Sequence, residues 1–368
     1  MSARATTLAQ AFSNKLLKEM YESSLADAIV NRDYEGEVNE VGSKLNILNF
    51  NRISEKTYSG SNLTVDDITE NNSTLVIDTY KSFYWKEKTL DNWLSYIKNP
   101  HATIIAQKAQ ERNKNMDEYI LGKYSDVGAG NRVGTDYTTG DVTVNGSGAV
   151  TGNGTTFTAA MVGRGFKAVG NTKWYRVATY SGATSITIED DLDDVVSQYT
   201  GGAISGGSTY IIEAATVLAV TTSNLVATFA DLRQKLDEVE QYGLNPAPTE
   251  GRFAIVPPDF MNTVVRASGV VLHVPEVYTD LVKKGYLGDL LGFHLLQSTR
   301  LTGDNTNGWR IIAGHPGWMT FAEKLLHADI EEDLIGNFGS AYKDLFVYGG
   351  KVADSRRHFA TELFATFS

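Results

Sequence analysis

The chain has no cysteine among its 368 residues. This excludes disulfide frameworks, thiolate zinc sites and cysteine nucleophiles. Basic residues are also scarce, because 33 Lys and Arg stand against 44 Asp and Glu and the formal charge is −11. That balance argues against a surface that grips nucleic acid through its phosphates. No apolar run reaches the roughly 18 residues of a membrane-spanning helix, and we expect no secretory signal peptide.

What the chain does contain is enough apolar material for a core. Hydrophobic residues make up 42% and aromatic residues 10%, which is typical of a folded protein rather than a disordered one. The length suits one large domain or two to three ordinary ones. The chain contains both helical and strand-like segments and no convincing internal repeat, and we expect the α+β class.

Two helices and two strands are predicted in the first third. Apolar residues recur at the helical period over residues 13–30 and 90–122, and Gly122 is a suitable stop. Residues 44–51 and 75–85 read as strands, with Leu75, Ile77, Phe83 and Trp85 expected on one face of the second. The polar stretch between these strands buries little and is costly to order, so it is either disordered or held by something outside this chain.

Residues 128–213 differ sharply in composition. They hold 16 of the 34 glycines, and they contain no proline and no histidine. Short β-type runs alternate there with glycine turns, which predicts a small all-β unit inserted into the chain. The five runs are Val142–Val144, Phe166–Val169, Trp174–Thr179, Ser185–Ile188 and Tyr210–Ile212. Insertion requires that its ends, near Gly128 and Ala214, lie close together.

The remaining third is mixed. The pattern predicts a helix capped by Thr222 or Ser223, a buried strand at Phe253–Val256, a strand at Trp318–Phe321 and a final strand at Arg356–Phe367.

No catalytic, cofactor-binding or metal-ligating constellation is recognisable. The six histidines lack metal-ligand spacing, and His315, before Pro316, is best read as a turn residue. The glycine-rich segment 128–134 is one residue too long for the dinucleotide fingerprint and follows no predicted strand. The acidic run 189–194 lacks the spacing of a calcium loop, and we interpret it as a solvated charge cluster. We therefore predict a structural protein that is not an enzyme and uses no cofactor.

Six segments, in order, resemble one family. They are "RDYEGEVNEVGSKLNI", "STLVIDTYKSFYWKE", "NMDEYILGKY", "RFAIVPPDFMNTVV", "KKGYLGDLLGFHLLQSTRL" and "KDLFVYGGKVADSRRHFATELFATF". Together they resemble the major capsid (coat) proteins of tailed double-stranded DNA bacteriophages. The resemblance covers nearly the whole chain outside residues 128–213.

This resemblance implies a domain plan within the tailed-phage major-capsid fold. It comprises an N-terminal arm (1–43), an extended E-loop (44–86), a peripheral domain with a long spine helix (87–127), an inserted small β-barrel or Ig-like domain (128–213), a mainly axial domain (214–310) and a return to the peripheral domain (311–368).

The resemblance also implies a function. Such a protein self-assembles as hexamers and pentamers into an icosahedral head shell that encloses double-stranded DNA without sequence readout. Assembly would take place in the host bacterial cytoplasm, with no membrane involved. Scaffolding, portal and decoration proteins are potential partners.

The candidate residues are therefore intersubunit contacts. The E-loop set is Arg52, Lys56, Tyr58, Asp66 and Asp67, and the axial set is Tyr278, Asp280, Lys283, Lys284 and Asp289.

Two other functions remain open at this point. One is an encapsulin-type shell that encloses enzymes. The other is a carbohydrate-binding protein in which Trp174, Tyr175 and Tyr180 of the insert stack on sugars.

Overall fold

The structure is a computed structural model. It describes residues 24–34, 44–50, 58, 65, 70–88, 100–171, 173–191, 198–238, 246–266, 286–331 and 339–368. Residues 13–23 and 90–99, which belong to the two predicted N-terminal helices, lie outside this set. None of the described helices is long and apolar enough to cross a bilayer.

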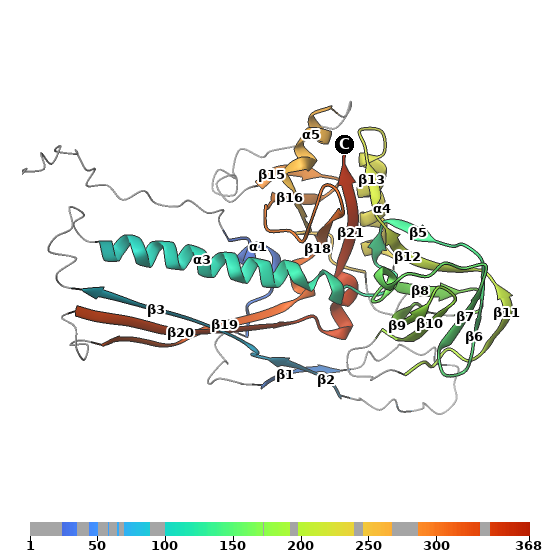
Figure 1. Cartoon of the computed structure of the whole chain (residues 1–368), viewed down its shortest axis with the longest axis horizontal. Coiled ribbons are helices and arrows are strands. Elements are labelled where there is room, and N and C mark those ends of the chain that lie inside the picture. Colours follow the sequence, from blue (N-terminus) through green and yellow to red (C-terminus); the bar gives the residue numbers. More distant parts are fainter. Residues whose placement is uncertain are drawn as a thin grey trace, which may run out of the picture.

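An elongated layer forms one end of the molecule (Figure 1). Its sheet has the order β19-β20-β3, with β3 at Thr79–Lys88, β19 at Thr320–Glu331 and β20 at Gly339–Lys351. The 23-residue helix α3 (Pro100–Gly122) runs along one face of this sheet. The antiparallel pair β1 (Lys44–Phe50) and β2 (Glu70–Val76) packs on the opposite face.

The N-terminal segment, residues 24–34, lies against α3 and forms backbone hydrogen bonds to the start of β19. Its single turn α1 (Ala26–Ile29) buries Leu25 and Ile29. The Asp117 carboxylate on α3 accepts hydrogen bonds from the Ser24 hydroxyl (2.9 Å) and the Leu25 backbone N–H, and it also contacts Arg300. Burial raises the pKa of Asp117 despite these partners.

A second sheet occupies the centre of the molecule. Its order is β13-β21-β18-β14-β16-β15, with β4 paired to β21 and β17 to β18. The strands are β4 (Arg132–Val133), β13 (Leu218–Val220), β14 (Phe253–Val256), β15 (Tyr286–Leu290), β16 (Phe293–Gln297), β17 (Gly303–Asp304), β18 (Gly308–Gly314) and β21 (Ala360–Phe367). Helices α4 (Leu225–Asp237) and α5 (Pro258–Arg266) contact β21. The main apolar core lies here.

A third sheet forms the opposite end of the molecule (Figure 1). Its order is β11-β6-β7-β10-β9-β8-β12-β5, and it encloses an apolar core of its own. The strands are β5 (Thr135–Tyr137), β6 (Asp141–Val144), β7 (Ala149–Asn153), β8 (Gly165–Ala168), β9 (Tyr175–Gly182), β10 (Ser185–Asp190), β11 (Ile204–Ser208) and β12 (Tyr210–Thr216). We call residues 135–216 the inserted sheet, after the prediction made for this segment.

The two ends of the inserted sheet lie together, as expected. The backbone N–H of Gly130 donates to the Glu213 carboxylate at 2.9 Å, and the N–H of Ala214 donates to Asp136 at 2.9 Å.

The predicted strand 75–85 is wrong in one respect, because it is two strands in different sheets. β2 ends at Val76 and pairs with β1, whereas β3 begins at Thr79 and pairs with β20. Leu75 and Ile77 pack into the small core beneath the sheet, while Trp85 stacks on Tyr342 on the side of α3. The four residues therefore do not share a face.

Two further boundaries differ from the predictions. Residues 354–359 form the 3₁₀ turn η5 (Asp354–Phe359), so the last strand begins only at Ala360. Residues 316–318 likewise form a 3₁₀ turn, η4 (Pro316–Trp318), before β19. Both turns lead almost directly into a strand, so the local residue pattern does not separate the turn from the strand.

Candidate functional site

Most of the predicted contact residues lie outside the described part of the chain. These are Arg52, Lys56, Asp66, Asp67, Tyr278, Asp280, Lys283 and Lys284. Tyr58 is described and is 67% exposed. Asp289 lies on β15, and its carboxylate contacts the ring Nδ1 of His294 on β16.

A groove runs between α3 and the edge strand β3. It has a volume of about 390 Å³ and is lined by Phe83, Tyr84, Trp85, Ile104, Gln107, Lys108 and Glu111. Tyr84 is 65% exposed and Ile105, beside the groove, 45%. This combination of an edge strand and half-exposed apolar side chains is typical of a surface that another chain covers.

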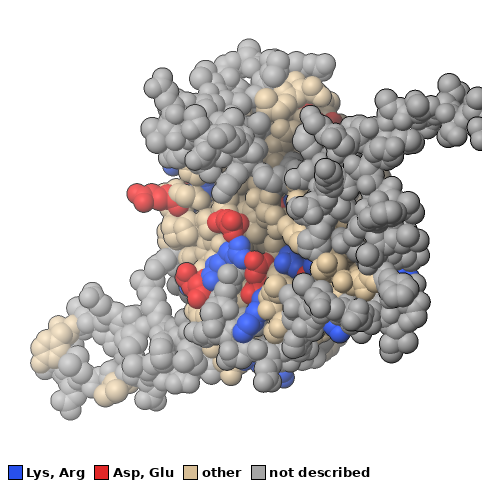
Figure 2. Space-filling view, turned by 90° about the vertical axis from the view of Figure 1, so that its left-hand side faces the viewer, with Lys and Arg blue, Asp and Glu red and all other residues tan. Residues whose placement is uncertain are grey.

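The charges near this groove are mixed in sign. Lys108 and Arg112 of α3 both pair with the Asp344 carboxylate of β20, at 2.9 Å for Arg112. Arg112 also lies over the Phe346 ring, 4.1 Å from its centroid. Figure 2 shows acidic and basic side chains interleaved on this end of the molecule rather than a patch of one sign.

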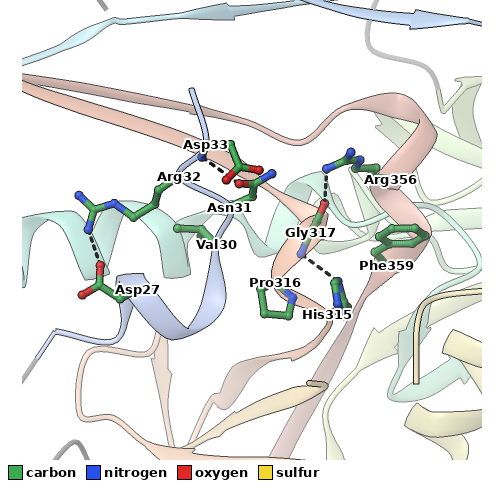
Figure 3. Close-up of a pocket in the computed structure, with 10 residues that line it drawn as sticks. All are labelled: Asp27, Val30, Asn31, Arg32, Asp33, His315, Pro316, Gly317, Arg356 and Phe359. Carbon is green, nitrogen blue, oxygen red and sulfur yellow. Dashed lines mark hydrogen bonds and ion pairs between the residues drawn. The ribbon is translucent and has the colours of Figure 1, made fainter. Parts of the chain in front are cut away.

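A second groove, of about 520 Å³, lies between the N-terminal segment and the two 3₁₀ turns. Figure 3 shows Arg32 on one side, turned toward Asp27, and Arg356 and Phe359 on the other. The Arg356 guanidinium donates to the Gly317 carbonyl at 3.3 Å.

His315 is a turn residue, as predicted. Its Nδ1 accepts the Gly317 N–H at 3.0 Å and so caps η4. Burial, followed by the charges of Arg252 and Arg356, lowers the pKa of His315. The neutral imidazole is the form that can accept this hydrogen bond.

A buried ionic network joins the inserted sheet to the central sheet. Its hub is Glu362 of β21, which is 0% exposed. Three guanidiniums converge on this carboxylate: Arg132 at 3.0 Å, Arg164 at 2.9 Å and Arg310 at 2.9 Å. Arg164 belongs to the inserted sheet and Arg310 to the central one, so the hub holds the two together. We call this the root network.

The glycine-rich loop 128–132 is part of the root network. The Glu213 carboxylate accepts the N–H groups of Gly130 (2.9 Å) and Arg132 (3.3 Å), and the Arg132 guanidinium lies beside it at 3.3 Å. Burial raises the pKa of Glu213 against the opposing charge of Arg132. The loop therefore does present N–H groups to an anion, as a phosphate-binding loop does, but the chain's own carboxylates fill it.

The acidic run 189–194 is not a solvated cluster throughout. Asp190 and Asp191 are 4% and 2% exposed. Asp190 accepts from Thr200 and Lys173, while Asp191 accepts from the Arg357 guanidinium at 3.1 Å and from the Ala129 N–H. The sequence could not reveal these partners because they come from other strands and turns. Among the residues that the structure describes, no three His, Asp or Glu side chains are grouped to hold a metal ion.

The aromatic residues of the sugar-binding alternative are mostly inaccessible. Trp174 is 7% and Tyr175 1% exposed, and only Tyr180, at 39%, faces solvent. Trp174 is enclosed by Lys167 of the inserted sheet and Lys235 of α4, which lie 5.5 and 5.7 Å from its ring centroid. It is therefore an interface residue within the chain, and that alternative is not supported.

Sequence comparison identifies no relative, since neither a family model nor a curated protein matches this chain. Structural comparison finds chains of similar fold. A structure from Mycobacterium phage Che8 aligns with a TM-score of 0.57 at 16% identity and covers 98% of both chains. The capsid structure of the cyanophage P-SCSP1u aligns with 0.56 at 14% identity, covering 98% of this chain and 94% of its own. The capsid of Ralstonia phage GP4 aligns with 0.56 at 10% identity, covering 99% and 96%. The chain has the fold of these phage chains, two of which come from capsid structures.

Proposed function

We propose that this chain is the major capsid protein of a tailed double-stranded DNA bacteriophage. The observation that supports it is the likeness to phage capsid chains over almost the full length of both partners. A structural likeness confined to one sheet would be weaker support, because common folds host many functions. The proposed role is structural and requires no enzymatic site. Copies of the chain form hexamers and pentamers, and these close into an icosahedral shell around DNA.

In this proposal each region has an assembly role. Residues 44–86 are the E-loop, α3 is the spine helix of the peripheral domain, and residues 214–310 form most of the axial domain. The groove between α3 and β3 is a surface that a neighbouring subunit covers, since its apolar residues are half exposed in the single chain. The inserted sheet lies on the outside of the shell.

The net charge of the chain suits a shell that encloses DNA rather than a surface that binds its phosphates. A net charge of −11 gives no general attraction to phosphates. On the described part of the end face, basic and acidic side chains are also interleaved (Figure 2). Packaged DNA is then retained by the closed wall, and no sequence is read.

Electron microscopy of the purified, recombinantly expressed chain tests the proposal. We expect closed shells, tubes or capsomer rings. Reversing the charge of Asp66 and Asp67 together should abolish these assemblies while the subunit stays folded by circular dichroism. The matched control reverses Asp231 and Glu250, two exposed carboxylates elsewhere, and should assemble normally.

Different results separate the alternatives. Assemblies that copurify with nucleic acid support the phage shell, whereas assemblies that enclose a protein cargo point to an encapsulin-type compartment. If only unassembled subunits were seen, both with and without a coexpressed scaffolding protein, the result would contradict a shell function.

A further inference from the structure

The chain contains three Asn-Gly steps, at Asn145, Asn153 and Asn307. This dipeptide is the most reactive site for loss of the side-chain amide, because glycine leaves its backbone nitrogen open to the preceding side chain. All three asparagines are exposed. They differ in how the fold restrains them, and that difference decides which one reacts.

Asn145 is held at both its side chain and its backbone. Its Oδ1 accepts the N–H groups of Ser147 (3.0 Å) and Ala149 (2.8 Å) and the Ser147 hydroxyl (2.9 Å). Its own N–H donates to the Ala149 carbonyl at 2.9 Å. The side chain must break these hydrogen bonds before it can turn toward Gly146.

Asn307 is held by one carboxylate. Asp304 accepts the Asn307 backbone N–H at 2.7 Å and its side-chain amide at 2.9 Å. The following Gly308 is buried against Phe364, so its nitrogen is shielded from base and water. Both reacting groups are therefore restrained.

The side chain of Asn153 lacks such restraints, although its backbone is paired in the β6–β7 ladder. It is the last residue of β7, and no side-chain hydrogen bond of Asn153 is found within the described residues. Gly154 is exposed, has a φ of 70° and lies outside the strand. We propose that Asn153 is a site of spontaneous deamidation, and that the fold directs the reaction there and away from Asn145 and Asn307.

The reaction needs only base and water. The Gly154 nitrogen loses its proton to base and attacks Cγ of Asn153. The new N–Cγ bond closes a succinimide ring as the Cγ–Nδ2 bond breaks and ammonia leaves. Water then opens either carbonyl of the ring, which leaves aspartate or isoaspartate at position 153.

The product has a structural consequence. Asn153 lies directly opposite Asp141 in the β6–β7 pair. A carboxylate at position 153 would place two like charges across this pair, which is destabilising. Deamidation therefore loosens the β6–β7 end of the inserted sheet as the protein ages.

The test follows all three sites in one molecule. The full-length folded chain is incubated in mildly alkaline buffer and digested, and fragmentation mass spectrometry quantifies conversion at each asparagine. We expect Asn153 to react at least about tenfold faster than the other two, because hydrogen-bonded sites react only on local opening. The same chain unfolded in urea is the control and should lose the preference.

Two further measurements complete the design. An Asn153→Gln variant should remain unmodified at position 153, because the larger ring closes slowly, and should keep its melting temperature on ageing. Equal rates at the three sites in the folded chain would overturn the inference. So would an Asn153 that stays intact when folded but reacts in urea. The inference does not depend on shell assembly.

Discussion

The root network and the α3 surface use charge in opposite ways. At the root, Glu362 and the side chains of Arg132 and Arg164 are 1–7% exposed. Along α3, Lys108 and Arg112 are 15% and 22% exposed around Asp344. Both are clusters of basic side chains on one buried carboxylate. Only the root network includes guanidiniums that are themselves buried, those of Arg132 and Arg164, whereas its third guanidinium, Arg310, is 19% exposed.

The difference shows what each cluster can do. Buried charges that lose a partner cannot turn to water, so the root network fixes one geometry between the inserted and central sheets. The α3 charges can be hydrated when a partner leaves, so that surface tolerates exchange between solvent and another chain. The root network, which fixes the two sheets rigidly, and the α3 surface, which can adapt to a partner, are thus made of the same residue types.

The largest expected effect comes from Glu362→Gln. This change keeps the side chain's shape but leaves Arg132, Arg164 and Arg310 around a neutral amide. We expect the unassembled subunit to lose about 3–5 kcal/mol of unfolding free energy, as when one partner of a buried ion pair is removed. Denaturant titration followed by circular dichroism measures the loss.

Asp344→Asn is the matched control, because it makes the same chemical change at the α3 surface. The asparagine can still accept the Phe83 N–H, and the two cations can reach water. The loss there should be about 1 kcal/mol. Similar losses in both variants would contradict the contrast between the two clusters.

An intermediate loss of stability is expected from Gly130→Ala. This change disrupts the packing of the loop 128–132 in the root network without changing any charge. Gly130 has a φ of 95°, and an added Cβ would lie 2.6 Å from Cδ1 of Trp174. Strain and overpacking should together cost about 2 kcal/mol or more. Gly122→Ala at the exposed end of α3 is the control, since no atom lies within 4 Å of its added Cβ. A neutral Gly130→Ala would mean that the loop is not closely packed on Trp174.

The inserted sheet illustrates what could be predicted from the sequence. Glycine turns and short apolar runs located five of its strands, because strand and turn preferences are local properties. The paired ends near Gly130 and Glu213 followed from the geometry of insertion. The same local pattern gave a wrong prediction at Ile77. There the alternation with a period of two continues, although the chain passes from one sheet to another.

The root network could not be predicted, because its members come from distant parts of the chain. Arg132 and Glu362 are 230 residues apart. One local signal was present: Glu362 is the only charged residue in the apolar strand Ala360–Phe367. A carboxylate in a strand buried on both faces requires a partner, but the sequence does not say which of the basic residues supplies it.

The smallest expected effect uses pH to test the open groove of Figure 3. The pKa of His315 is lowered in the fold, by burial first and then by Arg252 and Arg356. The unfolded chain, with an ordinary histidine pKa of about 6.5, therefore binds the proton more readily than the folded chain. The contribution of His315 to stability is full above that pKa and is lost as the pH falls through the lower folded value.

His315→Asn isolates this contribution, because asparagine can accept the Gly317 N–H and does not titrate. We expect the wild-type advantage over this variant to shrink on mild acidification, by no more than about 1 kcal/mol, the worth of one hydrogen bond. Denaturant titrations of both proteins across the histidine range measure it. The groove should therefore respond to mild acid through His315. A wild-type advantage that grows on acidification would show that His315 is stabilised in its charged form, and the cap at η4 would then need another explanation.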